Sequence, residues 1–236
     1  MLLERLQRPV RGVRIVRKDP RVFDPKAIGA QIVPQRRLTE QEITSTLAQL
    51  HDVSGRIVTS AMSESEQAIF LDVGFVQYEA LYLLQHNLRD RSQRRPGRHR
   101  TRTGRRSDLS TVLDIDQRSF DDFWTMDRDA FYAAKKATPV HRYQVATINR
   151  RVVGYAITGR AGRSSFLQRL GVDPAVRGEG IGSDLVLDAF DWAVSQGAMS
   201  MLVNTQVSNA NAKSLYESLG FTLAEERLHV LEWERS

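Results

Sequence analysis

A glycine-rich loop between a strand and a helix is the feature that most constrains how this chain can fold. Residues 165–172 are predicted to form a strand, and residues 181–197 an amphipathic helix with one apolar face. Between them stand Gly178, Gly180 and Gly182, which let the backbone approach a ligand closely. The amide groups and positive dipole at the start of the helix favour a pyrophosphate. The stretch therefore predicts an anion-binding turn.

Two familiar phosphate-binding motifs do not fit this loop. A P-loop has Lys followed by Ser or Thr after its last glycine, whereas Ser183 directly follows Gly182 here. A dinucleotide-binding fold begins with a parallel strand–helix–strand unit, whereas this loop follows predicted antiparallel strands. Arg177, at the start of the loop, adds a positive charge that suits a phosphate group.

The C-terminal piece, residues 107–236, alternates helices and strands regularly. Two predicted helices precede three strands, and then come a helix, a strand, a helix and a strand. A tight turn at Asn149 and Arg150 joins the first two strands, so they are expected to pair antiparallel. The order predicts an α/β fold with a mixed sheet. The predicted helices are 108–120, 121–137, 181–197 and 211–220, and the predicted strands are 141–148, 151–159, 165–172, 200–207 and 226–234.

The N-terminal piece, residues 1–88, resembles the second half of the C-terminal piece. A shift of 146 residues places Gly74 on Gly220 and Phe70 on Tyr216 without gaps. We interpret the N-terminal piece as a degenerate half-repeat. Its predicted strands are 12–18, 55–61 and 78–85, and its predicted helices are 37–50 and 63–74.

The basic residues concentrate in an Arg-rich connector, residues 89–106. The connector holds nine arginines and one aspartate, and because the whole chain has a net charge of +6, the other residues sum to −2. Pro96, Gly97 and Gly104 favour a solvated linker, which could include the first strand of the next domain. The connector has no aromatic residue for base stacking, so nucleic acid is not the expected partner. A nucleic-acid-associated protein with salt-dependent binding stays an alternative.

Composition excludes several classes of protein and site. With 236 residues, the chain can bury the core of one large or two small domains. It has no cysteine, which excludes disulfides and thiolate zinc sites, and its five histidines lack metal-ligand spacing. It has no run of 18 apolar residues, and its first residues do not resemble a secretory signal. A cytoplasmic enzyme or binding module with neither a metal nor a membrane partner is expected.

Two spaced motifs resemble signatures of the GCN5-related N-acetyltransferase (GNAT) superfamily. Residues 177–182 match the R/Q-x-x-G-x-G/A motif, which in that family binds the pyrophosphate of acetyl-CoA. Residues 209–221 match the second signature at the expected distance, and residues 154–159 resemble the third strand. The second signature consists of Asn209, Ala212, Leu215, Tyr216, Glu217, Gly220 and Phe221, and the first helix of the family resembles the segment with Asp108, Leu109, Asp116 and Phe120.

The resemblance covers about residues 100–236 and is incomplete in the N-terminal piece. Residues 31–36 stand where the glycine motif would be, and Phe70 replaces the tyrosine. We therefore expect the N-terminal piece neither to bind acetyl-CoA nor to catalyse. Tandem members of the superfamily, such as the mycothiol synthases, pair an active and an inactive unit in a similar way.

The resemblance implies an acetyl-CoA-dependent N-acetyltransferase with a GNAT fold. Backbone groups near Leu170 and Val172 would hold the pantetheine arm and the acetyl carbonyl, and would stabilise the oxyanion as an amine attacks. Asn209 would support the cofactor arm, and Tyr216 would protonate the departing thiolate as the catalytic acid. The implied acetyl-CoA-binding residues are Leu170, Gly171, Val172, Arg177, Gly178, Glu179, Gly180, Ile181, Gly182, Asn209 and Tyr216.

Simpler structural roles compete with these assignments. Tyr216 could be a core aromatic, and Asn209 could be only a helix N-cap. Asn204 and Gln206 share one side of a predicted strand and could line the site. Four aromatic residues at helical spacing could form core or acceptor wall, and six aspartates of 114–129 could attract a cationic acceptor or face solvent. These residues are Phe120, Phe123, Trp124 and Phe131, and Asp114, Asp116, Asp121, Asp122, Asp127 and Asp129.

The sequence leaves the general base open. Many relatives carry a Glu on the strand before the glycine loop, whereas this strand reads Phe166-Leu167-Gln168-Arg169. A base acting through water, or an amine that is already neutral, is also compatible with the sequence. The candidates are Asp121, Asp122, Glu225, Glu226 and His229, the last expected to be satisfied or exposed.

Together these observations predict direct acetyl transfer to a primary amine of a protein or small molecule. Because the chain has no cysteine to carry the acetyl group, a ternary complex is favoured over an acetyl-enzyme. The alternative is a non-catalytic module that binds acetyl-CoA or a partner protein. The N-terminal piece could complete the fold, shape the acceptor site or form a homodimer interface.

Overall fold

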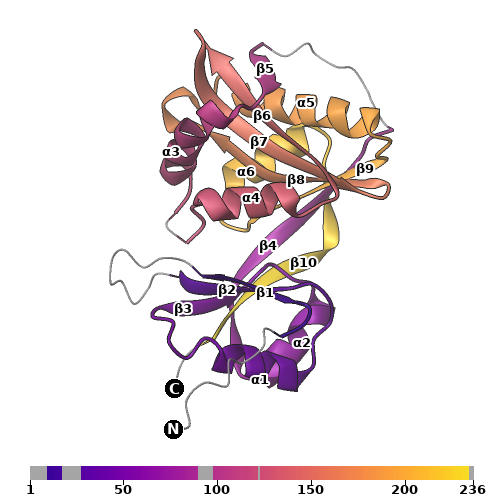
Figure 1. Cartoon of the computed structure of the whole chain (residues 1–236). Coiled ribbons are helices and arrows are strands. Elements are labelled where there is room, and N and C mark those ends of the chain that lie inside the picture. Colours follow the sequence, from indigo (N-terminus) through magenta and orange to yellow (C-terminus); the bar gives the residue numbers. More distant parts are fainter. Residues whose placement is uncertain (1–9, 18–27, 90–97, 122, 234–236) are drawn as a thin grey trace. The chain divides into compact units, whose positions relative to one another are not determined.

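The computed structural model describes residues 10–17, 28–89, 98–121 and 123–233. The chain divides into two compact units (Figure 1). The first unit comprises Met1–Tyr82 and Glu225–Ser236, and the second comprises Leu83–Ala224. The second unit contains the glycine-rich loop and both GNAT-like motifs.

The second unit is a mixed α/β fold whose strands lie in the order β9, β8, β7, β6 and β5. Neighbouring strands from β5 to β8 are antiparallel, whereas β8 and β9 run parallel. Residues 83–87, the end of β4, lie beside β9. The strands are β5 (Arg100–Thr103), β6 (Val140–Ile148), β7 (Arg151–Ala161), β8 (Ser164–Val172) and β9 (Ser200–Gln206); the helices are α3 (Leu109–Ser119), α4 (Arg128–Lys136), α5 (Ile181–Ser195) and α6 (Ala210–Ser218), with short 3₁₀ turns at Arg106–Asp108 and Pro174–Val176.

Helices lie on both faces of the strands of this unit (Figure 1), and alternate residues of a strand point to opposite faces. On one face, Val112 of α3 and Phe131 of α4 share an apolar cluster with Tyr155. On the other face, a β-carbon at Gly154 would lie 3.2 Å from the Leu185 side chain of α5. The sheet is thus covered by α3 and α4 on one face and by α5 on the other.

The hairpin between β6 and β7 confirms the predicted tight turn. Asn149 and Arg150 both have positive φ angles, 49° and 66°. Two consecutive left-handed residues make the two-residue turn that matches the twist of paired antiparallel strands. The turn therefore sets the register of the two strands.

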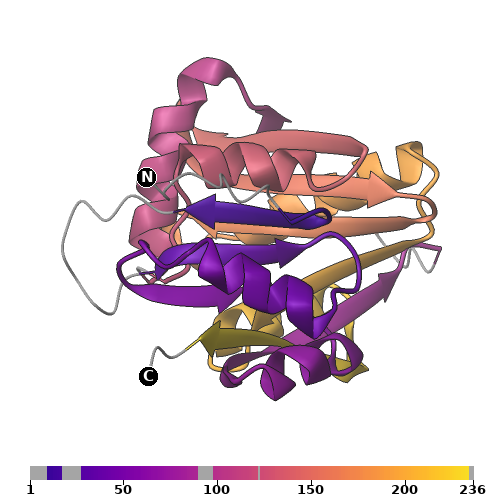
Figure 2. The same ribbon diagram turned by 60° about the horizontal axis from the view of Figure 1, so that its bottom comes forward.

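The first unit is a smaller layer of strands in the order β1, β2, β3 and β10, with β4 next to β10 (Figure 2). Strands β2 and β3 run parallel, while β1 pairs with β2 and β10 pairs with β3 in antiparallel fashion. Ile32, Ile43, Phe70 and Leu231 join one buried apolar cluster. The strands are β1 (Val13–Arg17), β2 (Ile28–Pro34), β3 (Arg56–Thr59), β4 (Phe75–Asn87) and β10 (Thr222–Trp233), and the helices are α1 (Glu40–Ala48) and α2 (Glu64–Asp72).

Helices α2 and α6 keep the 146-residue offset seen in the sequence. Both ends of α6 lie 146 positions after the ends of α2. Each helix follows an N-cap residue, Ser63 before α2 and Asn209 before α6. Each also follows a strand that runs parallel to its neighbour, β3 beside β2 and β9 beside β8. This similarity supports the half-repeat interpretation.

Several predicted boundaries differ from the structure, and the helix predicted over 121–137 differs most. The predicted helix 121–137 begins only at Arg128, because Asp127 caps it by accepting a hydrogen bond from the Ala130 amide at 2.7 Å. Strand β2 was not predicted, since its residues were aligned with the glycine motif. The predicted division at 88 and 107 also shifts: the second unit begins at Leu83, and residues 225–236 belong to the first unit.

The Arg-rich connector is partly a strand. Residues 90–97 lie outside the described residues, but β5 falls within the remainder and pairs with β6. Arg102 donates two hydrogen bonds to Asp108, at 2.7 and 2.8 Å. The described arginines of the connector are therefore not all solvated.

Candidate active site

The glycine loop turns the chain from β8 into α5 and opens the start of the helix. Gly178 and Gly180 have φ angles of 85° and 91°, which residues other than glycine rarely adopt. A β-carbon at either position would meet no atom within 4 Å. The glycines are thus required by backbone conformation, and the space beside them is open for a ligand.

The first amides of α5 point into this space without a side-chain cap. Gly180 is the N-cap residue, and its carbonyl accepts the Asp184 amide at 3.0 Å. The amides of Ile181, Gly182 and Ser183 precede that first helical hydrogen bond, so the helix itself gives them no acceptor. Together with the exposed Arg177, they suit the two negative groups of a pyrophosphate.

Gly182 is required for packing rather than for backbone conformation. A β-carbon there would lie 3.1 Å from Cδ2 of Leu215 in α6 and 3.8 Å from Cγ2 of Val172 in β8. The close approach brings the start of α5 against the helix that carries Tyr216. The two predicted signature motifs therefore meet in the structure.

Strand β8 separates from β9 before it reaches the loop. The two strands pair only from Ser164 to Phe166 of β8, whereas β8 continues to Val172. On the other side, the Asp173 amide donates to Val153 of β7 at 2.9 Å, so the alternation of an antiparallel ladder directs Leu170 and Val172 away from β7. Their backbone groups therefore face the opening between β8 and β9.

A β-bulge in β8 sets which side chains face α3. Ile157 of β7 pairs with Arg169, but the next residue, Thr158, pairs with Leu167, so Gln168 is the extra residue. A bulge shifts the alternation of the strand by one position. Arg169 therefore faces α3 and α4, while Val172 packs near the start of α5. The sequence analysis did not predict this bulge.

The end of α3 holds the glycine loop in place. Arg118 forms a bidentate ion pair with Asp173, with distances of 2.9 and 3.1 Å. The Ser119 hydroxyl donates to the Val172 carbonyl at 3.0 Å, and Arg177 donates to the Ser119 carbonyl at 3.2 Å. The loop is thus tied to α3 on both sides of the turn.

Tyr216 lies in α6, with 5% of its surface exposed. Its ring packs against Phe221 with centroids 5.5 Å apart. Burial raises the pKa of Tyr216 well above its ordinary value, and the positive charge of Arg169 partly opposes the rise. The hydroxyl therefore stays protonated at neutral pH, the state that a general acid needs.

Asn209 caps helix α6. Its Oδ1 accepts the Ala212 amide at 3.0 Å, which is the structural alternative raised from the sequence. The capping bond uses the acceptor of the amide group, and the Nδ2 donors are separate. A contact of Nδ2 with acetyl-CoA stays a prediction.

A buried ion pair between Asp116 and Arg169 was missed by the sequence analysis. Asp116 is fully buried, not on a solvated face, and Arg169 donates to it from Nε at 2.8 Å and from Nη2 at 2.9 Å. The Tyr155 hydroxyl also donates to this carboxylate. An aspartate among apolar residues of α3 and an arginine on β8 were the available signals.

The structure separates the candidate bases. Asp121 is exposed in the loop before α4, and Asp122 lies outside the described residues. Glu225, Glu226 and His229 belong to the first unit. His229 is 8% exposed, so it is not exposed as predicted. Its ring nitrogens have no hydrogen-bond partner among the described residues, and its Nε2 lies 4.0 Å from the Glu64 carboxylate.

The aromatic and amide candidates have mixed positions. Phe131 is core, at 2% exposure, while Phe123 and Trp124 are half-buried in the loop before α4 rather than on a helix. On β9, Asn204 is exposed and Gln206 is half-buried. Both amides lie beyond the last pair that β9 forms with β8, so they border the opening between the strands.

At the corresponding place in the first unit the two parallel strands stay paired, and a cavity of about 350 Å³ lies beyond their ends, lined by residues that include Pro34, Arg36 and Ser60. Strands β2 and β3 stay paired to Ile32 and Thr59, and the Ser60 amide continues the ladder to the Ile32 carbonyl at 2.9 Å. Strands β2 and β3 are therefore hydrogen-bonded to each other almost to their last residues. They leave no long unpaired edge like that of β8.

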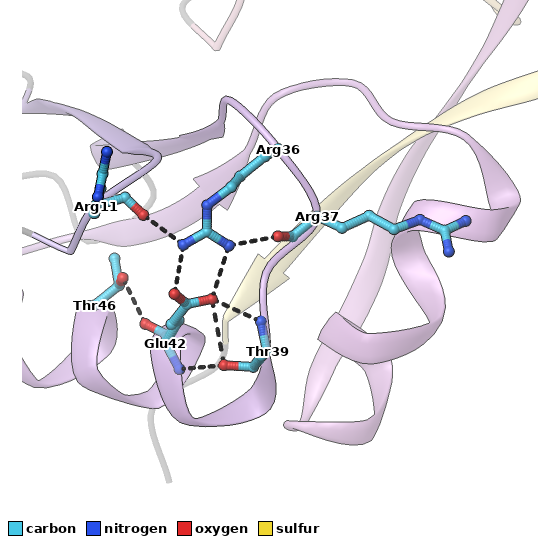
Figure 3. Close-up of polar contacts among 6 residues, drawn as sticks. All are labelled: Arg11, Arg36, Arg37, Thr39, Glu42 and Thr46. Atoms are coloured by element: carbon cyan, nitrogen blue, oxygen red, sulfur yellow. Dashed lines mark hydrogen bonds and ion pairs between the residues drawn. The ribbon is translucent and has the colours of Figure 1, made fainter.

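The start of α1 is occupied by a carboxylate of the chain itself (Figure 3). Glu42 accepts the Thr39 amide at 2.9 Å and two hydrogen bonds from Arg36, at 2.5 and 3.1 Å. The hydrogen bonds from Arg36, and then that from the Thr39 amide, lower the pKa of Glu42 to about 2. The Thr39 amide and the Arg36 guanidinium are therefore already paired with a carboxylate of the chain.

Residues 10–17, 28–89, 98–121 and 123–233 contain neither a metal-binding cluster nor a membrane-spanning helix. Across these residues, no group of three or more His, Asp or Glu side chains is arranged to hold a metal ion. No helix within the same ranges is long and apolar enough to cross a membrane.

Comparisons with known proteins identify relatives of the second unit. The sequence matches the Acetyltransferase (GNAT) family over residues 109–221. N-alpha-acetyltransferase RimI of Mycobacterium tuberculosis is 33% identical over 122 residues, which cover 49% of this chain and 73% of that protein. The ribosomal protein bS18-alanine N-acetyltransferase of Escherichia coli K12 is 29% identical over 118 residues, 50% of this chain and 77% of that protein.

A solved structure extends the likeness of fold to both units. The GCN5-related N-acetyltransferase from Kribbella flavida is 14% identical, with a TM-score of 0.65 over 98% of this chain and 93% of that chain. The predicted GNAT fold and its acetyl donor are confirmed. The chain belongs to the GNAT family and is an N-acetyltransferase that uses acetyl-CoA.

Proposed function

We propose that the second unit transfers the acetyl group of acetyl-CoA directly to an α-amino group. The observation that carries the proposal is the open edge of β8, which ends at the uncapped start of α5. An extended chain with a pyrophosphate at one end fits such a path. The absence of cysteine supports transfer without an acetyl-enzyme.

The residues present fit acetyl-CoA along this path. The first amides of α5, those of Ile181, Gly182 and Ser183, would hold the pyrophosphate together with Arg177. The backbone of Leu170 and neighbouring residues would bind the pantetheine arm and the acetyl carbonyl. Bound there, acetyl-CoA supplies an activated acetyl thioester.

Each reacting group then has a partner in the chain. Backbone amides at the open edge of β8 would stabilise negative charge on the carbonyl oxygen as the amine nitrogen attacks its carbon. As the carbon–sulfur bond breaks, Tyr216 would donate its hydroxyl proton to the sulfur. The amine nitrogen loses a proton to solvent. The Tyr216 hydroxyl is protonated at neutral pH, so its proton is available for this transfer.

An α-amine acceptor is supported by chemistry and by the relatives. The carboxylate of Asp116 accepts four hydrogen bonds, so it is poorly placed to take a proton from an amine. Where the described residues assign no strong base, the favoured acceptor is an amine that is already neutral. An α-amine has a pKa of about 7.7–8.0 against about 10.4 for lysine. Two relatives are named as N-alpha- and ribosomal-protein-alanine acetyltransferases.

The first unit is proposed to act without acetyl-CoA. Its strands stay paired where β8 and β9 part, and Glu42 occupies the start of α1. We propose that it supports the catalytic unit as a degenerate half-repeat. The homodimer and the cytoplasmic location stay predictions.

Calorimetric titration of acetyl-CoA tests the site. The wild-type chain should bind one equivalent, and Gly180→Glu should not, because its side chain and charge enter the space for the pyrophosphate. Gly197→Glu is the matched control, since Gly197 also has a positive φ, of 79°, and open space, but lies after the other end of α5. The control should retain binding.

Turnover tests the acceptor. The wild-type chain should acetylate a lysine-free hexapeptide with a free α-amine, but not an N-terminally blocked peptide with one lysine. Acetylation of lysine alone would overturn the α-amine assignment. Absence of acetyl-CoA binding by the wild-type chain would overturn the cofactor site, and binding without turnover on any amine would favour a non-catalytic module.

A further inference from the structure

The Asp116 carboxylate is a buried junction of three parts of the second unit. It is fully buried on α3 and accepts the Tyr155 hydroxyl of β7 and two hydrogen bonds from Arg169 of β8. Its Oδ1 also accepts the Met126 amide at 2.6 Å. One carboxylate thus connects two strands and the 123–127 loop, the segment that precedes α4.

Arg169 adds its own contacts to the same loop. Its Nη2 donates to the Trp124 carbonyl at 2.5 Å, and its guanidinium carbon lies 3.6 Å above the Phe120 ring at the end of α3. The Arg169 side chain is 16% exposed. Arg169 and Asp116 therefore hold the 123–127 loop through a backbone carbonyl and a backbone amide at once.

The location of Arg169 links this loop to the reacting edge. Arg169 directly precedes Leu170, whose backbone faces the opening between β8 and β9. The bulge at Gln168 turns Arg169 toward α3 and α4, on the face opposite α5. Because the start of α5 is the proposed pyrophosphate site, the face with Arg169 and the 123–127 loop is left for the amine.

Net stability does not account for charges in this position. Removing a guanidinium and a carboxylate from water costs as much as their attraction returns, so an apolar pair of similar volume is often as stable. A bidentate arginine does fix the direction of the groups that it contacts. The pair is therefore better suited to setting geometry than to adding stability.

We propose that Arg169, held by Asp116, is a positioning residue that fixes the 123–127 loop as the acceptor side of the acetyl-transfer site. The inference rests on the proposed function. It assigns Arg169 no contact with acetyl-CoA and no transfer of protons. Loss of Arg169 therefore impairs use of the amine while leaving acetyl-CoA affinity nearly unchanged.

The test compares Arg169→Met with Arg102→Met in the full chain. Arg102 forms a similar bidentate pair with Asp108, at 2.7 and 2.8 Å, at the other end of α3. Arg169→Lys keeps the positive charge but loses the planar guanidinium that donates two hydrogen bonds at once, so it should not restore function. Acetyl-CoA affinity is measured by calorimetry, and kcat and KM are measured with the free α-amine hexapeptide.

The expected result is a 10- to 100-fold loss of kcat/KM for the hexapeptide in Arg169→Met, roughly the cost of a misplaced reactant. Arg102→Met should keep kcat/KM, even if it lowers the melting temperature equally. Equal kinetic losses in both variants, or full rescue by lysine, would overturn the proposal. Loss of acetyl-CoA binding in Arg169→Met would also overturn it.

Hydrogen exchange gives a readout that needs no acceptor. Amide exchange across the 123–127 loop should rise in Arg169→Met and in Asp116→Asn, but not in Arg102→Met. Unchanged exchange in Arg169→Met would overturn the proposal even if the proposed function holds. Failure of the wild-type chain to bind acetyl-CoA would instead refute the proposed function.

Discussion

The Asp173 carboxylate lies between the guanidinium of Arg118 and the Ala175 amide, at the turn from β8 into the glycine loop. Partial burial would raise the pKa of Asp173, but the hydrogen bonds from Ala175 and Arg118 outweigh it and lower the pKa. The loop is thereby attached to the end of α3. The loop amides that would bind the ligand are thus oriented with the help of Arg118, a side chain distant in sequence.

Asp173→Asn should lower the affinity for acetyl-CoA, while it lowers the free energy of unfolding only slightly. The Arg118 side chain is 52% exposed, so the ion pair contributes at most about 1 kcal/mol to stability. The loop geometry depends on it more directly. Calorimetry should show a lower acetyl-CoA affinity at pH 7, with a small drop in melting temperature. Unchanged affinity would show that the loop holds its shape without the pair.

Gly182→Ala should lower acetyl-CoA affinity through crowding against Leu215. The added β-carbon would lie 3.1 Å from Cδ2 of Leu215, tighter than usual, whereas alanine by itself favours a helix by about 1 kcal/mol. Gly182→Ala combined with Leu215→Ala should recover affinity by relieving the contact. A double variant as weak as the single one would argue against crowding as the cause.

Tyr216→Phe should reduce kcat by about 10²–10⁴-fold, as expected for loss of a general acid, with little change in acetyl-CoA affinity. Because burial raises the pKa of Tyr216, the wild-type rate should show no alkaline loss from this group until the pH exceeds the ordinary tyrosine value of about 10. Steady-state kinetics from pH 6 to 10 would check both points. A phenylalanine variant with wild-type kcat would remove Tyr216 from the mechanism.

The free energy of unfolding should fall above about pH 10, and Tyr155→Phe should reduce that dependence. Burial raises the pKa of Tyr155, so the folded state keeps its proton where the unfolded state releases it at about pH 10. This contribution is complete below the unfolded pKa and is lost as the pH rises toward the folded pKa. Urea unfolding at pH 8 and 10.5 measures the free energy of unfolding of both proteins. An equal decrease between the two pH values in wild type and Tyr155→Phe would contradict the prediction.

Glu42→Gln should destabilise the first unit at pH 7 but not near pH 2. The pKa of Glu42 is lowered to about 2 from the ordinary 4.5, so its contribution is present above about pH 4.5 and is lost as the pH falls through about 2. Calorimetric melting temperatures of wild type and variant should converge across that window. Glu66→Gln, which removes a capping carboxylate on α2, is the matched control. A constant difference from pH 7 to pH 2 would refute this assignment.

Local sequence was enough to predict much of the fold. Glycines at 178, 180 and 182, the Asn149-Arg150 turn and the amphipathic α5 each act within a few residues, so their patterns are legible in one chain. The same holds for the proposed roles of Arg177 and Tyr216, which follow from spaced motifs.

The sequence by itself determined the family and was enough to predict the cofactor half of the site, because turns, helix starts and spaced motifs depend on neighbouring residues. Only the tertiary structure decided where β8 leaves β9, where the bulge at Gln168 falls, and that Asp116 is buried against Arg169. These features depend on residues up to 53 positions apart. Strand register and the pairing of buried charges are set by packing between elements, which no local pattern specifies.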